Sequence, residues 1–242
     1  MSALGHYLEE DGIATVAIAL IRPQAENTRP PRALWVPFEL GRPFGPPSDA
    51  AFQKRVLLAA LSMLIDGGGP VRIVDFPDDD PRAVPDPMWR PPFVSAAAAS
   101  GAAELLSAEL QSEVSLLQDA HQRWMARYGR STVGLSGLSI TDCARYVADW
   151  LSGKAPPSPR DGFSAPLILR FAVDDLKAYC LEAAGAGTAR PSSRQPGDWL
   201  WNETATGAAL HALRERLLVH EDERLRLIVA NFMVPAARLR TA

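Results

Sequence analysis

The chain has 242 residues, of which 47% are hydrophobic and 22% are charged, and its formal net charge is −3. This composition is that of a globular protein and excludes wholesale disorder, and the length suits two modest domains. Residues up to position 80 carry 7 basic and 11 acidic side chains and the remainder carries 18 and 17, so neither part has the basic surface of a nucleic-acid-binding protein.

The sequence shows no recognisable membrane span or export signal. Its longest apolar runs, such as residues 13–21, are far shorter than the roughly 20 residues that a membrane span needs. The first residues lack the basic and apolar regions of a signal peptide, so we expect a cytoplasmic protein that binds neither membranes nor nucleic acids. The two cysteines, Cys143 and Cys180, are then expected to be reduced. Their spacing does not match a metal site, and we expect no cofactor.

The first 76 residues predict alternating helices and strands. Residues 3–10 have apolar side chains at helical spacing and are followed by a glycine, so we expect a short helix. Residues 13–20 are almost continuously apolar and rich in β-branched side chains, which is typical of a strand covered on both faces of a parallel sheet. Residues 32–36 predict a neighbouring parallel strand, 51–65 a helix, and 71–76 a short third strand.

The predicted sheet is incomplete. Two or three strands are marginally stable by themselves, and strands buried on both faces require further strands beside them and helices above and below. The sequence therefore predicts a partial α/β domain over residues 1–76, containing a fragment of a doubly wound parallel sheet. We expect the missing strands to come from an N-terminal half upstream, from another chain or from a second copy of this chain.

The rest of the chain predicts a linker and a second domain. Residues 77–96 are acidic and proline-rich, which is typical of a linker or an extended arm. Residues 97–242 predict an all-α bundle, because long helical patterns follow one another with short connections. The expected helices are 102–128, 140–151, 164–184, 197–220 and 221–234. The predicted fold class is therefore α/β plus α.

The most specific pattern lies in a proline- and glycine-rich segment near the predicted second strand. It reads Pro30-Pro31-Arg32-Ala33, Val36-Pro37-Phe38 and Leu40-Gly41-Arg42-Pro43, with Gln53 further on. These motifs resemble the selenoprotein B family of glycine, sarcosine, betaine and D-proline reductases. The resemblance covers positions 1–80, and the helical remainder looks like a domain appended in some relatives.

The resemblance implies a reaction and a missing nucleophile. Members of that family use a selenocysteine or cysteine, with a second cysteine three residues on, followed by a Thr-Arg-Thr stretch and the opening helix. The resemblance places Met1 inside that helix, where the family has a valine. We therefore hypothesise that Met1 is a GTG codon read as a start and that an in-frame UGA upstream encodes selenocysteine. The full enzyme would cleave a C–N bond or a related bond reductively, with a small-molecule substrate and a dithiol reductant protein as partners.

The chain as given is then expected to be inactive. Neither Cys143 nor Cys180 matches the nucleophile, because both lie in predicted helices of the second domain, where a small buried hydrophobic residue is the favoured interpretation. Two functions remain open. One is a thiol- or selenol-dependent reductase truncated upstream of its nucleophile, and the other is a non-catalytic binding or regulatory module that acts through the helical domain.

Candidate substrate-binding residues flank the predicted strands and occupy the loop that follows them. Arg22, Arg32 and Arg42 lie near strand ends or in that loop, and ligands of doubly wound sheets bind beyond the carboxyl ends of the strands. A guanidinium group there could hold a substrate carboxylate through two hydrogen bonds, and the alternative is a solvated surface arginine. Gly41 and Gly45 shape the loop around Arg42.

Other candidates have simpler explanations. A bundle could bring metal-ligating side chains together, but the sequence contains no Glu-x-x-His or His-x-x-x-His pair. Helix pairing or surface roles are therefore favoured for His121, Glu182, Asp198, Glu203 and His211. The run Gly134-Leu135-Ser136-Gly137-Leu138 resembles a nucleophile elbow, but leucine stands where the motif needs its last glycine, and no strand precedes it.

Overall fold

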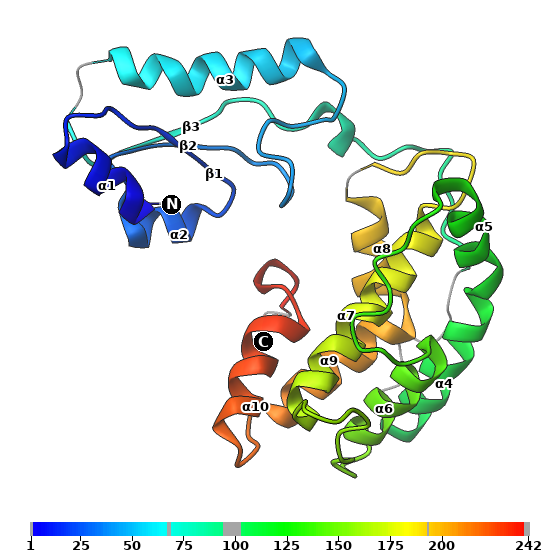
Figure 1. The fold of residues 1–242 in the computed structure, drawn as a ribbon. Helices are drawn as coiled ribbons and strands as arrows, with labels where there is room; N and C mark the ends of the chain where they lie inside the picture. The colour runs from blue at the N-terminus through cyan, green and yellow to red at the C-terminus, as the bar shows by residue number, and fades with distance from the viewer. Residues whose placement is uncertain (1, 67–68, 94–102, 193, 240–242) are drawn as a thin grey trace. The chain divides into compact units, whose positions relative to one another are not determined.

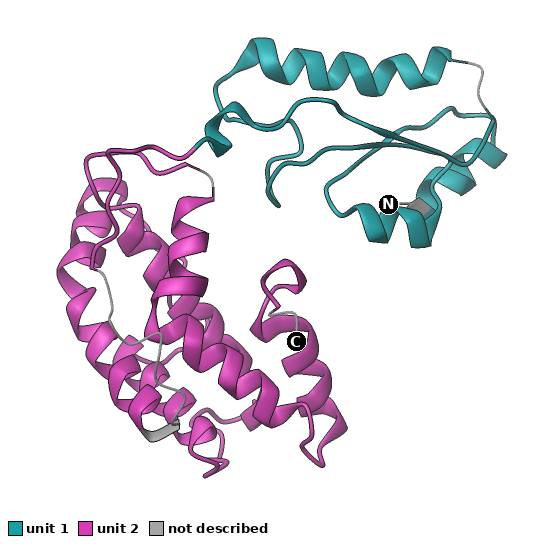
Figure 2. Ribbon diagram, turned by 180° about the vertical axis from the view of Figure 1, so that it is seen from behind, with its two compact units in different colours: residues 1–84 teal, residues 85–242 magenta. Residues whose placement is uncertain are grey.

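The computed structural model describes residues 2–66, 69–93, 103–192 and 194–239 (Figure 1). It divides into two compact units, Met1–Val84 and Pro85–Ala242, which Figure 2 distinguishes by colour. The division lies inside the segment that the sequence predicts as a linker. At a coarse level the fold is α/β plus α, with a small parallel sheet and its helices in unit 1 and helices in unit 2.

Unit 1 contains a parallel sheet of three short strands in the order β1-β2-β3. β1 spans Ala17–Ala19, β2 spans Arg32–Trp35 and β3 spans Arg72–Asp75. In register, Ala33 of β2 lies between Ala17 of β1 and Ile73 of β3. β1 is shorter than the strand predicted over 13–20, because only the last part of that apolar run extends alongside β2.

Helices lie on both faces of this sheet. α3 (Ala50–Ile65) lies along one face, and α1 (Ser2–Glu10) and α2 (Arg22–Thr28) lie by the other (Figure 1). A short 3-10 helix, η1 (Pro81–Ala83), follows β3. The sequence analysis missed α2, because its seven residues are mostly polar and too few to show a helical period. Pro23 in its first turn is the local signal that marks it.

The core of unit 1 joins β2 to α3. Its buried side chains are Leu34, Val36, Phe38, Phe52, Val56, Ala60, Met63 and Phe76. The rings of Phe38, Phe52 and Phe76 contact one another, with centroids 5.5 to 6.0 Å apart. Asp49 fixes the start of α3, where its carboxylate accepts a hydrogen bond from the amide of Phe52 at 3.0 Å. The aromatic cluster thereby holds the segments that follow β2 and β3 against the first turn of α3.

Unit 2 is built from helices in the residues that the structure describes. They are α4 (Ala103–Leu116), α5 (Gln118–Tyr128), α6 (Ile140–Leu151), α7 (Ala165–Ala184), α8 (Gln195–Glu203), α9 (Ala205–Leu217) and α10 (Glu223–Ile228), followed by a π-helix, η3 (Val229–Met233), and a 3-10 turn, η4 (Ala236–Arg238). α7 packs against α5, α6 and α8, and α4 packs against α6 and α9. The core of unit 2 includes the side chains of Trp89, Trp150, Trp199 and Trp201.

Two helices that the sequence predicts as continuous are interrupted. The segment 102–128 divides at Leu117 into α4 and α5, and the segment 197–220 divides at Thr204 into α8 and α9. Thr204 has extended backbone angles, and its hydroxyl accepts a hydrogen bond from the amide of Gly207 at 2.9 Å. The prediction of one helix over 197–220 is therefore wrong, because a threonine cap begins a new helix inside it.

The second half of the predicted linker is packed onto unit 2. Trp89 is buried, and its indole nitrogen donates a hydrogen bond to the carbonyl of Ala184 at 3.2 Å. The side-chain amide of Gln195 exchanges two hydrogen bonds with the backbone of Asp86, at 2.9 and 3.0 Å. Residues 85–93 therefore form part of unit 2, and the remaining predicted linker residues, 94–96, lie outside the described residues.

Buried carboxylates connect the helices of unit 2 to its loops. Glu113, Asp175 and Glu182 are each more than nine-tenths buried, and each accepts hydrogen bonds from backbone amides of a loop or a helix start. Burial raises the pKa of Glu113 above its ordinary value. Burial also opposes ionisation of Glu182, but the hydrogen bonds that it accepts from Thr132, Ser131 and His121 outweigh burial and lower its pKa.

Candidate functional site

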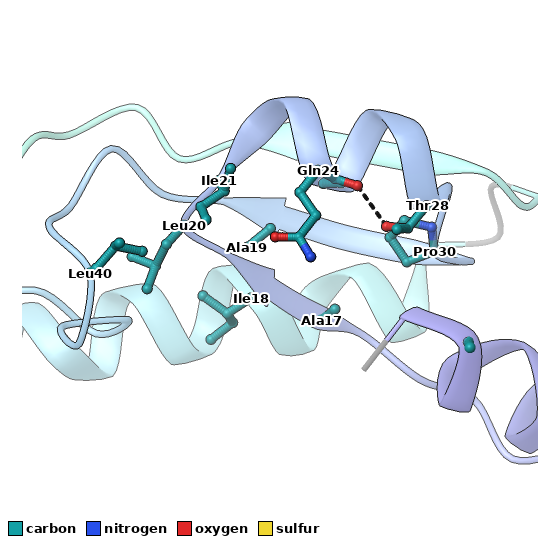
Figure 3. A pocket seen from close by; sticks show the side chains of 11 residues that line it. Ala17, Ile18, Ala19, Leu20, Ile21, Gln24, Thr28, Pro30 and Leu40 are labelled. Carbon is teal, nitrogen blue, oxygen red and sulfur yellow. Dashed lines mark hydrogen bonds between the residues drawn. The ribbon is translucent and has the colours of Figure 1, made fainter. Parts of the chain in front are cut away.

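A groove of about 460 Å³ runs along the outer edge of β1 (Figure 3). Its lining residues are Ala17, Ile18, Ala19, Leu20 and Ile21 from β1 and its end, Gln24, Ala25, Thr28 and Pro30 from α2 and the turn after it, Leu40 from the loop after β2, and Ala3 from α1. Most of these side chains are apolar, and the polar ones are Gln24 and Thr28. The groove therefore offers an apolar surface with two hydrogen-bonding side chains on the α2 side.

The groove follows from the position of β1 in the sheet. β1 pairs with β2 on one side, and within the described part of unit 1 no strand pairs with its other side. Figure 3 shows α2 and α3 on opposite faces of the sheet beside this free edge. A free edge leaves a row of backbone N–H and C=O groups available to a further strand.

The polar side of the groove comes from α2, which the sequence analysis did not identify. Gln24 extends from α2 toward β1, and the hydroxyl of Thr28 donates a hydrogen bond to the backbone carbonyl of Gln24 at 2.7 Å (Figure 3). Arg29 follows in the left-handed region, with φ of 46°, and ends the helix. Pro23 in the first turn is the sequence signal that could have located these two residues.

Arg22 lies just past the carboxyl end of β1, where the sequence places it, but carboxylates already hold it. Its guanidinium group pairs with Glu26 at 3.0 Å and with Asp75 at the end of β3. It also lies over the ring of Trp35, 5.5 Å from the centroid. These contacts tie the ends of the three strands together, so Arg22 has a structural role in this arrangement.

Arg42 is the less tightly paired arginine on this side of the sheet. It sits in the loop after β2, and its side chain is 41% exposed, with one guanidinium nitrogen 4.0 Å from the carboxylate of the buried Asp80. Gly41 and Gly45 flank it with φ of 88° and 83°, which non-glycine residues rarely adopt. A side chain at Gly45 would also collide with the ring of Phe52. The loop shape that presents Arg42 therefore depends on both glycines.

Arg32 lies at the opposite end of the sheet from Arg22 and Arg42. It begins β2, and its guanidinium group pairs with Glu9 of α1. The carboxylate of Glu9 also accepts hydrogen bonds from the amide and the hydroxyl of Thr15, at 2.7 and 3.1 Å. The amide of Thr15 and then the side chain of Arg32 lower the pKa of Glu9. The structure thus places Arg22 and Arg42 at one end of the strands and Arg32 at the other. Arg32 connects β2 to α1.

Both cysteines are fully buried in unit 2. Burial raises the pKa of Cys143 to about 11 and raises that of Cys180 further. A thiol with a raised pKa and no solvent access is a poor nucleophile. Neither cysteine therefore has the properties of a catalytic thiol.

The candidate metal ligands of the sequence analysis do not form one cluster. The imidazole of His121 meets the carboxylate of Glu182 at 2.9 Å, whereas Asp198 pairs with Arg238 at 2.5 Å. Across the residues with described positions, no three histidine, cysteine or acidic side chains are arranged to hold a metal ion. A search of the helices with described positions likewise finds none with both the length and the apolar character to cross a membrane.

Comparisons with known proteins give no further assignment. No family model, no curated protein and no solved structure matches this chain. Functional inference therefore depends on the motifs of the sequence and on the geometry of the groove and its loop.

Proposed function

We propose that unit 1 is the strand-and-loop scaffold of a thiol- or selenol-dependent reductase of the glycine, sarcosine, betaine and D-proline reductase type. Its three strands would then be part of a doubly wound sheet that is completed by a further segment. The observation that supports this proposal most directly is the free edge of β1, with an apolar groove beside it. A strand added along β1 would pair with its free backbone groups and cover the groove.

In this proposal the added segment supplies the nucleophile. The described residues of unit 1 contain no cysteine, and the cysteines of unit 2 are buried. Ala3, in the first turn of α1, lines the groove, so a segment that precedes α1 would enter beside it. The resemblance places the start of this helix upstream of Met1, and the free N–H groups at that start would favour an ionised thiol or selenol there.

Arg42 is the residue that we expect to bind substrate. The substrates of the family that the motifs resemble carry a carboxylate, and a guanidinium group binds a carboxylate through paired hydrogen bonds. Arg42 suits this role better than Arg22 or Arg32, because those two have close carboxylate partners and Arg42 has none. The weak contact of Arg42 with Asp80, at 4.0 Å, would be exchanged for the contact with substrate.

The proposal is tested by extending the chain upstream. The gene should be expressed from the codons that precede Met1, with cysteine at any in-frame UGA, and compared with residues 1–242. With a dithiol as reductant, the extended protein should release amine or open the ring of one of the four family substrates, and the shorter chain should not.

Matched variants of the extended protein test the site. Arg42→Gln should lower kcat/KM about tenfold or more, because a guanidinium contact to carboxylate is lost. Arg82→Gln, which changes an exposed arginine of η1, should leave it unchanged. An extended protein that folds and turns over none of the four substrates would contradict the reductase assignment.

The alternative is a non-catalytic binding or regulatory module that acts through unit 2. Burial of both cysteines favours it, because the described residues then present no accessible thiol. Under this alternative the extended protein remains inactive. Substitutions in unit 2 should then weaken the binding of a partner to the full chain, and Arg42→Gln should leave that binding unchanged.

A further inference from the structure

Unit 2 contains a pocket of about 360 Å³ where α6 and α9 end, which is independent of the groove in unit 1. The residues that line it and that matter here are Trp150, Ala155, Arg216, Leu217, Val219 and His220. α6 ends at Leu151, and α9 ends at Leu217, so the pocket is formed by the last turns of both helices and the turns after them. Its volume is within the range of small-molecule sites, which begins at about 300 Å³.

The polar side chains of this pocket are hydrogen-bond donors. The indole nitrogen of Trp150 is buried and forms no hydrogen bond of good geometry within the described residues, although it lies near the hydroxyl of Tyr146. The hydroxyl of its neighbour Tyr146 lies within hydrogen-bond distance of the carbonyls of Pro156 and Ala165, at 3.5 and 3.3 Å, and donates its single hydrogen to one of them at a time. The imidazole of His220 accepts a hydrogen bond from the amide of Asp222 through Nδ1 at 3.1 Å. In the neutral ring the hydrogen is therefore on Nε2, and this nitrogen is a donor.

Arg216 brings a positive charge that no acidic residue neutralises. Its side chain forms no ion pair or hydrogen bond with any residue whose position is described. The guanidinium group lies against Gly153, where φ is 84° and any side chain would collide with it. Arg216 also lies in the last turn of α9, where a positive charge interacts favourably with the helix dipole. That interaction would operate without a pocket beside the side chain.

Among the acidic residues close in sequence to the pocket, Asp149 and Asp222 have partners of their own, whereas Glu215 and Glu221 are exposed and form no ion pair with Arg216. Asp149 pairs with Lys154 at 2.9 Å. The carboxylate of Asp222 accepts a hydrogen bond from the amide of Arg224 at 2.8 Å and caps α10. No aspartate or glutamate is among the residues that line the pocket. A ligand must therefore bring the acceptors and the negative charge.

We propose that this pocket binds a small monocarboxylate with an apolar body. The carboxylate would meet Arg216, with the indole of Trp150 and Nε2 of His220 as further donors, and Ala155, Leu217 and Val219 would contact the apolar part. A ligand with hydrogen-bond donors alone would find no acceptor among these side chains. A purely polar anion would leave the apolar walls without contact.

Benzoate is a suitable probe, because it combines one carboxylate with an apolar ring. The full chain labelled with ¹⁵N-tryptophan gives indole signals, and Trp150→Phe identifies the signal of Trp150. Titration with benzoate should move that signal saturably. Benzamide has the same shape without the charge and should bind about tenfold more weakly or not at all.

A matched pair of variants decides the role of the charge. Arg216→Gln should weaken benzoate binding about tenfold, whereas Arg123→Gln, which changes an exposed arginine of α5, should leave it unchanged. Circular dichroism confirms that both variants are folded. The proposal is overturned if benzoate gives no saturable shift at Trp150, if benzamide binds as tightly as benzoate, or if both variants bind benzoate equally well.

Discussion

Replacing Asp175 with asparagine should destabilise unit 2 strongly. Asp175 lies in α7, and its side chain is fully buried. One carboxylate oxygen accepts hydrogen bonds from the amides of Gly134 and Leu135, both at 2.8 Å. The other oxygen accepts from the amide and the hydroxyl of Ser136, at 2.9 and 2.5 Å. A single side chain therefore anchors three consecutive amides of the loop before α6.

The magnitude follows from what asparagine retains. Its one oxygen can still accept from Gly134 and Leu135, but its NH₂ group meets the amide of Ser136, and two donors then face each other. A buried donor without a partner costs about 1–3 kcal/mol, and loss of the negative charge weakens the bonds that remain. We expect the free energy of unfolding to fall by about 2–4 kcal/mol.

The assay is urea unfolding followed by tryptophan fluorescence, which reports on the tryptophans buried in unit 2. The neighbouring Asp174 provides a matched control, because it is 31% exposed and pairs with Lys177 at 2.7 Å on the helix surface. Asp174→Asn should lower the free energy of unfolding by less than about 1 kcal/mol. Equal losses in the two variants would refute the anchoring role of Asp175.

Three further predictions follow from buried groups and from one glycine. The pKa of Glu182 is lowered in the folded state, so its contribution to stability is present above the unfolded pKa of about 4.3 and is lost as the pH falls through the folded pKa. Glu182→Gln should therefore lose less stability on acidification than the parent chain in urea unfolding, and parallel pH profiles would contradict this. Gly45→Ala should cost about 1–3 kcal/mol more than Gly12→Ala, because both have φ near 80° but only the former meets an aromatic ring; equal losses in thermal unfolding would reject the packing argument. Cys143 and Cys180 should resist a thiol reagent in the native protein and react fully in urea, and rapid native labelling would disprove their burial.

Elements with strong local signals could be predicted closely from the sequence. The segment 140–151 coincides with α6, and the hydroxyl of Ser139 caps its start by accepting a hydrogen bond from the amide of Asp142 at 3.1 Å. The segment 51–65 begins one residue later than α3. By contrast, Thr204 sits in a sequence of good helical spacing, and its role as a cap appears once α8 and α9 pack against each other. The periodicity of the sequence does not show that α8 and α9 pack against each other.

The candidate site shows the same limit. The sequence locates Arg22 and Arg32 near strand ends, but whether a guanidinium group is available depends on partners far away in the chain. Arg22 pairs with Asp75, and Arg32 pairs with Glu9, through the folding of β3 and α1 against the other elements. The spacing of these residues along the chain does not show which of them form ion pairs. The small number of strands in the sequence predicts an incomplete sheet, but the position of β1 at its edge comes from the structure.

Unit 1 leaves several large apolar side chains exposed. Besides the groove along β1, the outward side of α3 exposes Leu57, Leu58, Leu61 and Ile65, the last at 86%. Strands of parallel sheets are normally flanked by other strands and covered on both faces, because their backbone groups and apolar side chains both require partners. One strand added beside β1 would satisfy its free backbone groups and cover the groove. Under the proposed function the same segment carries the nucleophile, so stability and reductase activity of unit 1 should be gained together by the upstream extension.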